Sequence, residues 1–393
     1  MNVHLLLDLL LMLGIGLTAV LLAQLSISTR RYKLSQEELE KINRLEDTPT
    51  VSLCIPARNE THALEDCLSS AIGSDYPKLE IIVLDDCSQD KTSQIIRSFA
   101  HDGVRFISGD VPSEGWLGKN NAYQALATQA KGEYLVFMSV DTRVAPESIS
   151  QLISYMQLEK LSMVSVLPRR IDNLRSSVIF APLRYFWQLV LPLRFNTPLA
   201  TSIWSIRGDN LAEVGGFSTF KDKVEVENLL ASQLNTKDEY RFLVGSHLLN
   251  VTYAKQWSSQ VETAIRLWYP NLGRSIFRAF LAILAHFLLF ILPALVLLQF
   301  LITLGSHGDY LQAYWLLALV SSALASYLYA SYFRQVKKVK SLPDYLTFII
   351  SFFVLPLLAL QEIILIIASF VQYKRGQVNW KGRNVCYPIV KRY

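Results

Sequence analysis

Long apolar stretches lie at both ends of this chain of 393 residues and enclose a central region of ordinary polarity. Residues 3–24 carry a single charged side chain, and three further stretches cover residues 277–304, 311–333 and 342–372. At about 1.5 Å per residue, each is long enough to cross roughly 30 Å of hydrocarbon as a helix. The chain is therefore expected to be an integral membrane protein with a folded domain between its membrane segments.

Composition supports this hybrid and excludes other classes. The chain is 51% hydrophobic and 18% charged, too apolar for an ordinary soluble domain and too charged for a pure membrane bundle. A net charge of +5 is too dilute over this length for a protein that binds nucleic acid. The four Cys form no CxxC pair, so neither a disulfide scaffold nor a zinc site is expected.

Basic residues set the expected orientation. Arg30, Arg31 and Lys33 follow the first stretch, so residues 1–28 are interpreted as an anchor with the next segment in the cytoplasm. A cleaved signal peptide is the alternative, but no Lys or Arg precedes the apolar run. The basic connection at residues 334–340 is likewise expected inside.

The last apolar stretch, within a membrane region of residues 276–372, leaves two topologies open. A cytoplasmic basic tail, residues 373–393, would require a hairpin or re-entrant bend at Pro356, whereas an external tail would require one long tilted span. The charge bias favours the cytoplasmic tail. Glu362 and His286 fall within apolar stretches and are functional candidates, although His286 is also suited to a packing hydrogen bond.

The central region, residues 48–275, alternates short apolar runs with helical segments. Strands are predicted at residues 51–57, 79–85, 104–108 and 133–138, and helices at 61–72, 91–100 and 119–131. Such alternation predicts an α/β fold with a largely parallel sheet and helices on both faces. Ligands of these sheets bind at the carboxyl ends of the strands.

Acidic residues stand at those strand ends. Asp85 and Asp86 follow the second strand and Asp141 follows the fourth. Adjacent acids repel each other, so they are expected where a ligand or cation uses them. Asp90, before Lys91, is better suited to capping a helix.

The motifs at these positions resemble those of the membrane-bound family 2 glycosyltransferases, which have the GT-A fold. The resemblance covers about residues 50–275. It rests on PARNE at 56–60, DDCSQD at 85–90, GWLGKN at 115–120, the acid at 141 and RGDNLAEVGGF at 207–217. Within the family, the chain is most similar to bacterial enzymes of the carotenoid and hopanoid type that glycosylate lipids. WKGR at 380–383 looks like the ending of several of these enzymes.

The resemblance implies a nucleotide site at the first two strand ends. Uracil and ribose are expected near Pro56, Ala57, Arg58 and Glu60, with Asp85 or Asp86 bonded to the base or ribose. Arg58 is also expected to form an ion pair with one of these two acids.

Three residues of GWLGKN complete the expected donor site. Lys119 would approach the diphosphate or sugar after the turn at Gly118, and Trp116 would cover the sugar ring or simply the core.

Asp141 would be the surviving half of the family's DxD metal motif, because Ser139 replaces the first acid. Hard cations prefer oxygen ligands, so one carboxylate, a hydroxyl and the phosphates are expected to hold Mg²⁺ or Mn²⁺.

The family's general base follows GGF in a pattern like ED-x-x-LA. Aligning the LA places Glu227 at the base position and Val226 at the preceding acid, and Glu225 is the rival. A carboxylate on the face opposite the departing diphosphate would invert the anomeric configuration.

The acceptor side is expected at the membrane surface. Arg266 and Trp268, with Trp380 in the tail, are predicted near the acceptor, and residues 176–195 are predicted to lie along the bilayer. The chain lacks the Q-x-x-R-W motif of processive synthases, which favours a single transfer.

Together these features predict a hexosyltransferase that inverts configuration. The expected donor is a nucleotide diphosphate sugar with UDP as nucleotide, and the expected acceptor is a membrane lipid, of the polyisoprenoid or carotenoid class. The alternatives are a non-catalytic, membrane-anchored nucleotide-binding protein and a polysaccharide synthase. The donor sugar, the acceptor lipid and the oligomeric state stay open.

Overall fold

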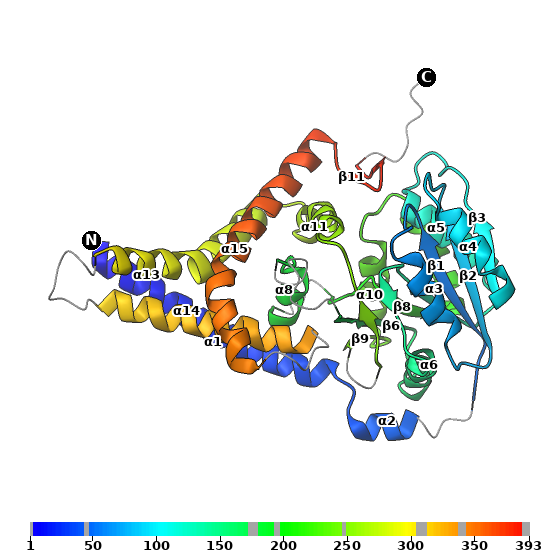
Figure 1. The fold of residues 1–393 in the computed structure, drawn as a ribbon, viewed down its shortest axis with the longest axis horizontal. Coiled ribbons are helices and arrows are strands. Elements are labelled where there is room, and N and C mark those ends of the chain that lie inside the picture. The colour runs from blue at the N-terminus through cyan, green and yellow to red at the C-terminus, as the bar shows by residue number, and fades with distance from the viewer. Residues whose placement is uncertain are drawn as a thin grey trace. The chain divides into compact units, whose positions relative to one another are not determined.

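The computed structural model describes residues 3–42, 47–171, 180–191, 197–245, 249–303, 313–336 and 343–386. The chain folds into two compact units (Figure 1). The helical unit comprises Met1–Arg31, Asn173–Leu193 and Gln256–Arg375. The sheet unit comprises Tyr32–Asp172, Arg194–Lys255 and Gly376–Tyr393. The tail after Arg375 therefore belongs to the sheet unit.

A mixed sheet of seven strands organises the sheet unit, in the order β3-β2-β1-β4-β8-β6-β9. Strands β3, β2, β1 and β4 are parallel, β8 runs antiparallel to both β4 and β6, and β6 is parallel to β9. The predicted mostly parallel sheet is confirmed. The strands are β1 Val51–Ala57, β2 Leu79–Asp85, β3 Val104–Ser108, β4 Tyr134–Met138, β6 Met163–Leu167, β8 Ile203–Arg207 and β9 Tyr240–Val244.

Helices pack on both faces of this sheet. Two of the three predicted helices begin later than expected. One reason is Asp90, whose carboxylate accepts from the Thr92 N–H at 3.0 Å, so that the helix starts at Thr92. The helices are α2 Gln36–Ile42, α3 Leu64–Ile72, α4 Thr92–Ser98, α5 Gly118–Gln129, α6 Ser148–Leu158, α9 Gly208–Glu213 and α10 Val226–Asn235.

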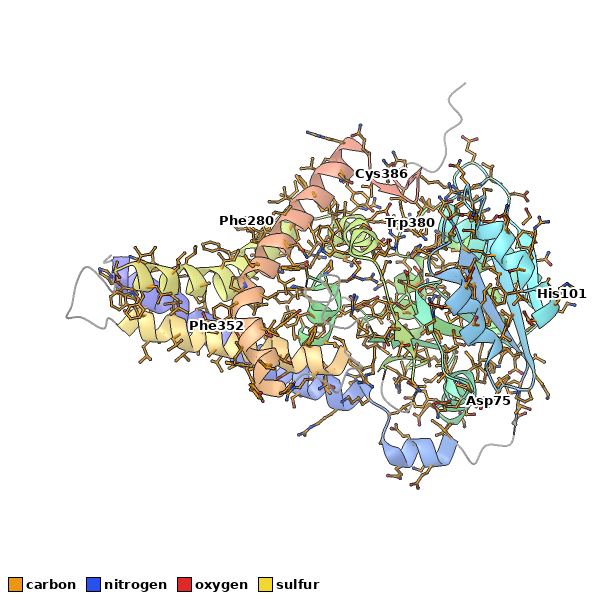
Figure 2. All side chains as sticks on the ribbon, viewed as in Figure 1. Asp75, His101, Phe280, Phe352, Trp380 and Cys386 are labelled. Carbon is orange, nitrogen blue, oxygen red and sulfur yellow. The ribbon has the colours of Figure 1, made fainter. Side chains whose placement is uncertain are left out.

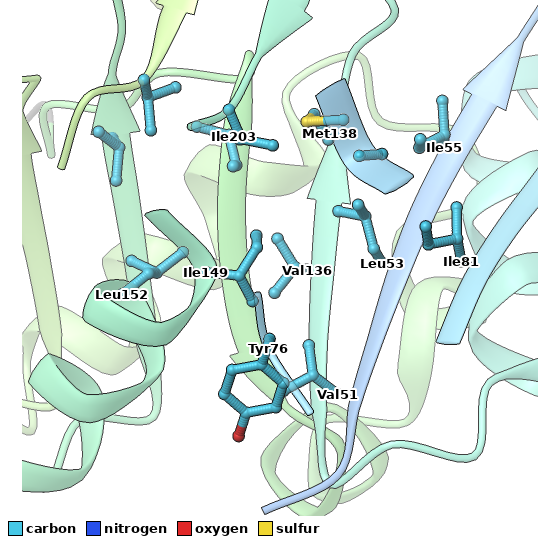
Figure 3. Packing of buried hydrophobic residues seen from close by; sticks show 14 of the residues in the cluster. Val51, Leu53, Ile55, Tyr76, Ile81, Val136, Met138, Ile149, Leu152 and Ile203 are labelled. Atoms are coloured by element: carbon cyan, nitrogen blue, oxygen red, sulfur yellow. The ribbon is translucent and has the colours of Figure 1, made fainter. Parts of the chain in front are cut away.

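The core lies between the sheet and the helices of one face (Figure 3). Leu53 and Ile55 of β1 contact this core together with Val136 of β4 and Ile149 and Leu152 of α6, and each is at most 1% exposed. Burial of each such side chain contributes about 1.5–3 kcal/mol. This packing holds the strands rigidly, and so fixes where their carboxyl ends lie.

Two small sheets complete the sheet unit. One has three strands, β5 Thr142–Arg143, β10 Thr252–Tyr253 and β7 Arg169–Arg170. The other is a hairpin in the tail, β11 Asn379–Trp380 and β12 Arg383–Asn384 (Figure 2). Its two turn residues, Lys381 and Gly382, both have positive φ, 47° and 79°. That combination is typical of the tight turns that match the twist of two strands.

Among the residues that the structure describes, four helices are long and apolar enough to cross a membrane, and they belong to the helical unit: His4–Tyr32, Ile276–Thr303, Tyr314–Val336 and Tyr345–Arg375. Apolar side chains such as Phe280 and Phe352 project from them (Figure 2). The helices are α1 Val3–Tyr32, α8 Arg184–Val190, α11 Trp257–Asn271, α12 Ile276–His286, α13 Leu292–Thr303, α14 Ala313–Val336 and α15 Asp344–Arg375. A π-helical segment, Phe287–Ile291, joins α12 to α13.

Two features of this unit differ from expectation. Helix α15 is continuous through Pro356, so the hairpin considered there does not form. Helix α11, placed by the sequence within the central domain, belongs to the helical unit. Of the predicted interfacial segment at residues 176–195, residues 184–190 form α8, whereas 176–179 and 192–195 lie outside the described residues.

Candidate active site

The first two strands end at the same level of the sheet. Ala57 pairs with Asp85, Pro56 pairs with Leu84, and the Asp86 N–H donates to the Ala57 carbonyl at 2.8 Å. The chain then turns sharply after each strand. Asn59 and Cys87 both have φ of 53°, in the left-handed region. The predicted nucleotide-binding residues are therefore neighbours at one edge of the sheet.

Arg58 contacts the acidic loop through backbone oxygens. Its Nη1 donates to the carbonyls of Asp86 and Cys87, the latter at 3.1 Å, and its Nε donates to the Lys381 carbonyl at 3.0 Å. The expected ion pair with a carboxylate of Asp85 or Asp86 is not among these contacts. The Asp85 carboxylate accepts instead from the Ser88 N–H at 3.1 Å and from the Ser93 hydroxyl, so it holds the loop after β2.

The tail hairpin places two cations on the acids of this edge. Lys381 forms an ion pair with Glu60, and Arg383 Nη1 lies 2.5 Å from Asp86 Oδ2. Both carboxylates are buried, with residue exposures of 7% for Glu60 and 5% for Asp86. Sequence reasoning assigned only Trp380 of this tail to a site. The sequence did contain a signal for these pairs. Lys381 and Arg383 are two basic residues two positions apart around a tight turn, and they complement the acids Glu60 and Asp86.

Burial shifts the proton affinity of these groups. It raises the pKa of Asp86, although the hydrogen bond and charge of Arg383 oppose the shift. Burial, followed by repulsion from Arg58, lowers the pKa of Lys381 to about 8. Lys381 is therefore a cation that loses its proton close to neutral pH.

Helix α5 connects the tail to the predicted base. At Gly118, its first residue, a side chain would collide with the guanidinium of Arg383. The next residue, Lys119, has its Nζ at 2.7 and 2.6 Å from the two carboxylate oxygens of Glu227. Tyr123, one turn later, donates to Glu227 Oε1 at 3.2 Å.

The same helix holds the segment that precedes the base. Asn120 is fully buried and its Nδ2 donates to the carbonyls of Phe220 and Lys223, both at 2.8 Å. Gln124 Oε1 accepts from the Phe217 N–H at 3.0 Å. The GWLGKN motif thus positions α10, on which Glu227 lies 1% exposed. Sequence reasoning missed Asn120 and Tyr123, whose partners are distant in the chain.

Glu225, the alternative base, and Trp116, predicted to cover the sugar ring, are both less buried than Glu227. Glu225 occupies the N-cap position of α10 and is partly exposed. Trp116 is partly exposed, and its backbone N–H donates to the Ser113 carbonyl at 3.1 Å. The geometry therefore separates a buried carboxylate, Glu227, from a more solvated one, Glu225.

A candidate cation site lies at the first and fourth strand ends. Ligand atoms of Glu60, His62 and Asp141 all lie within 4.8 Å of one another. The Ser139 hydroxyl, predicted to share the metal with Asp141, lies 3.0 Å from the hydroxyl of Thr142. Two carboxylates and an imidazole fit Mn²⁺ better than Mg²⁺, which prefers an all-oxygen shell. His62 was missed because the family motif pointed to residue 139.

Asp141 also has a cationic neighbour. Lys255 Nζ lies 3.6 Å from its Oδ2. Ligand atoms of Asp141 lie within 4.8 Å of those of Glu60, Glu60 pairs with Lys381, and Arg383 pairs with Asp86. The tail hairpin therefore links the acids that follow β1 and β2, and Asp141 lies beside them.

The predicted acceptor residues fall into different units. Trp380 belongs to the sheet unit, whereas Arg266 and Trp268 lie on α11 of the helical unit, 7% and 8% exposed. The Arg266 carbonyl accepts from the Tyr373 hydroxyl at 2.7 Å.

The two polar candidates of the apolar stretches are fully enclosed in the helical unit. His286 Nε2 accepts from the Trp187 indole at 3.0 Å, which is a packing hydrogen bond. Glu362 Oε1 accepts from the Leu183 N–H at 2.9 Å.

Comparisons with known proteins agree on one family. Residues 52–194 match the model of "Glycosyl transferase family 2". A 4,4'-diaponeurosporenoate glycosyltransferase of Staphylococcus haemolyticus is 32% identical over 141 residues, which cover 35% of this chain and 36% of that protein. A poly-beta-1,6-N-acetyl-D-glucosamine synthase of Staphylococcus epidermidis is 32% identical over 122 residues, 30% of this chain and 28% of that one. The chain thus spans about a third of the length of these relatives.

The structural likeness extends further. A mannosyltransferase from Pyrobaculum calidifontis, solved with GDP-Man and Mn²⁺, superposes with a TM-score of 0.50 at 18% identity. The superposition covers 92% of this chain and 98% of that one. At this identity the likeness concerns the fold alone, and it confirms the expected GT-A architecture.

Proposed function

Because residues 52–194 match the model of the family 2 glycosyltransferases, we propose that this protein transfers a hexose from a nucleotide diphosphate sugar to a membrane lipid. The observation that carries the proposal is the set of contacts linking Asp86, through Arg383, Gly118 and Lys119, to Glu227. These residues join the expected nucleotide site to the expected base within the sheet unit.

The donor occupies the edge formed by the ends of β1 and β2, and UDP is the nucleotide that the motifs favour. Its diphosphate replaces Glu60 and Asp86 as the partner of Lys381 and Arg383. The two cations then neutralise the charge that grows on the departing diphosphate. The released carboxylate of Asp86 accepts hydrogen bonds from the ribose hydroxyls or the base.

Glu227 takes the proton of the acceptor hydroxyl. The ion pair with Lys119 supports this role, because it stabilises the ionised form that a base requires. The motif resemblance implies that this base acts from the face opposite the diphosphate. Such attack inverts the anomeric configuration.

A divalent cation is part of the proposed site. Asp141, Glu60 and His62 would hold it, and when bound it supplies positive charge to the diphosphate. The Mn²⁺ in the Pyrobaculum mannosyltransferase agrees with this donor set. Glu60 pairs with Lys381 in the structure, so on binding the cation its carboxylate would exchange Lys381 for the metal ion.

The acceptor is a lipid of the polyisoprenoid or carotenoid class. Four helices apolar enough to cross a membrane support a lipid substrate, and the Staphylococcus haemolyticus relative is named for a diaponeurosporenoate acceptor. Trp380 of the sheet unit is proposed to lie near the acceptor at the membrane surface.

The proposal is tested with the purified full-length chain in nanodiscs that contain bacterial lipid extract. Release of nucleoside diphosphate from UDP-, GDP- and dTDP-sugars is measured with Mn²⁺ present, and Glu227→Gln serves as the matched control. We expect turnover with one donor and a lipid product carrying one sugar. Binding without turnover of any donor would contradict the proposal, and longer products would indicate a polysaccharide synthase, as in the second relative.

A further inference from the structure

We infer that α15 lies along the membrane surface, and that the chain crosses the bilayer three times, through α1, α12–α13 and α14. The tail is then on the same side as the sheet unit. This inference is independent of the proposed chemistry, because it rests on the path of the chain.

The path of the chain determines whether the number of membrane crossings between Lys255 and Gly376 is even or odd. The sheet unit contains Tyr32–Asp172, Arg194–Lys255 and Gly376–Tyr393. A folded unit lies on one side of a membrane, so the chain leaves it at Lys255 and returns to it at Gly376 on the same side. The number of crossings between these two residues must be even. Among the described residues of that interval, three helices are long and apolar enough to span, so at least one of them does not.

The tail is tied to the sheet unit by several polar contacts. Lys381 pairs with Glu60, Arg383 pairs with Asp86, and the Lys381 carbonyl accepts from Arg58. An α15 that crossed the bilayer would carry these residues to the opposite side, where none of the contacts could form.

Three of the helices form a bundle with alternating directions (Figure 1). His4, near the start of α1, stacks on Tyr314, near the start of α14, with ring centroids 5.3 Å apart. Leu11 of α1 packs with Val296 of α13 and Ala318 of α14. The chain therefore passes along α1, back along α12–α13, and again along α14. In Figure 1, α15 runs across these helices.

Helix α15 begins and ends on one side without turning. It starts at Asp344, eight positions after α14 ends at Val336, and continues unbroken to Arg375. Its 32 residues correspond to about 48 Å, longer than the hydrocarbon thickness. A continuous helix with both ends on one side of a bilayer must lie along its surface.

The two faces of α15 suit this position. Between Ile349 and Ile367 every exposed side chain of α15 is apolar. These residues offer the acyl chains a stripe with spacings of three and four positions: Ile349, Phe353, Leu357, Leu360, Ile364 and Ile367, between 46% and 69% exposed. The opposite face carries polar groups bonded to α11. Ser369 donates to the Ile265 carbonyl and accepts from the Tyr269 N–H at 3.0 Å. The bilayer leaflet next to the sheet unit is the partner of the apolar stripe.

Cysteine labelling shows on which side of the membrane the tail and the two connections between the helices lie. Cys54 and Cys67 are fully buried, so in a Cys87→Ser background the native Cys386 reports on the tail. Ser306→Cys, combined with Cys386→Ser, reports on the connection between α13 and α14, and Lys338→Cys in the same background reports on the connection between α14 and α15. A membrane-impermeant maleimide is applied to sealed vesicles that contain the full chain, before and after permeabilisation.

We expect positions 386 and 338 to label from the same side, and position 306 from the opposite side. If α15 spans, positions 386 and 306 label together, opposite to 338, and the inference is overturned. Either orientation of the protein in the vesicle leaves this comparison intact.

Depth measurements test the in-plane position separately. Spin labels are placed singly at Ile349, Phe353, Leu360 and Ile367, and their accessibility to oxygen is compared with that to a polar relaxant. These side chains are exposed, so labels there leave the packed face intact. Equal depths support the inference. A depth that rises to a maximum near Leu360 and falls at both ends would overturn it, whatever the labelling shows.

Discussion

Both carboxylate oxygens of Glu227 lie within hydrogen-bond distance of one ammonium group, Lys119 Nζ, at 2.7 and 2.6 Å. The two residues are 108 positions apart in the chain. Glu227 is 1% exposed, so the pair is removed from water and each charge depends on the other.

Loss of one partner should therefore destabilise the sheet unit. Removing one member of a buried ion pair costs about 3–5 kcal/mol, because the other charge stays buried and unpaired. We expect Lys119→Met to lower the melting temperature of the full chain in detergent by several degrees. The double variant Lys119→Met with Glu227→Met should recover most of the loss. Equal melting temperatures for the single variant and the parent would show that the pair contributes nothing.

Glu227 and Glu225 should differ sharply in activity. Loss of a general base lowers kcat by about 10²–10⁴-fold. We expect that loss for Glu227→Gln with little change in the KM of the donor, and near-parental rates for Glu225→Gln, since Glu225 is more solvated. The reverse order would make Glu225 the base. An unchanged rate for both would indicate an acceptor carboxylate, which needs no base.

Donor use should weaken as the pH rises through about 8. The pKa of Lys381 is lowered to about 8, so its ammonium is present below that pH and lost above it. The charge that neutralises the diphosphate disappears with it. We expect kcat/KM for the donor to fall above pH 8 in the parent. In Lys381→Arg, which stays charged, the fall should be absent, and Lys381→Met should be low at all pH values.

The pH profiles also provide the control. If the parent and Lys381→Arg lose kcat/KM together above pH 8, another group titrates and Lys381 has no such role.

The candidate cation site predicts which of three variants should bind Mn²⁺ more weakly than the parent. Mn²⁺ binding in the presence of UDP is measured by paramagnetic resonance of the free ion. Asp141→Asn and His62→Ala should each raise the Kd by about tenfold or more, equivalent to at least 1.4 kcal/mol. Ser139→Ala should bind as the parent does, because the Ser139 hydroxyl is bonded to Thr142. A large effect of Ser139→Ala with none of His62→Ala would restore the simple DxD-like site.

Gly118 should act through Arg383. A methyl group at position 118 collides with the guanidinium, so Gly118→Ala is expected to move the Arg383 guanidinium from its place beside Asp86 and raise the donor Kd about tenfold. In an Arg383→Ala background the same change should have little further effect. Gly16→Ala, where nothing lies within 4 Å of the added methyl, is the matched control. Additive effects of Gly118→Ala and Arg383→Ala would contradict the coupling.

The strands and their acids were predictable because they depend on local patterns. The run at 79–85 is buried and ends at Asp85, as its apolar sequence indicates. Asp141 and Glu227 were found through motifs whose spacing is short. Asn120 was not, because its partners, the carbonyls of Phe220 and Lys223, are backbone atoms a hundred positions away.

Sequence alone determined that four apolar helices flank an α/β domain, since hydrophobic burial and periodicity act over a few turns of chain. Only the tertiary structure decided which charges meet. The tail cations Lys381 and Arg383 pair with Glu60 and Asp86 across some 300 positions. Such pairings depend on where the chain returns in space, and a charged residue in a sequence does not specify its partner.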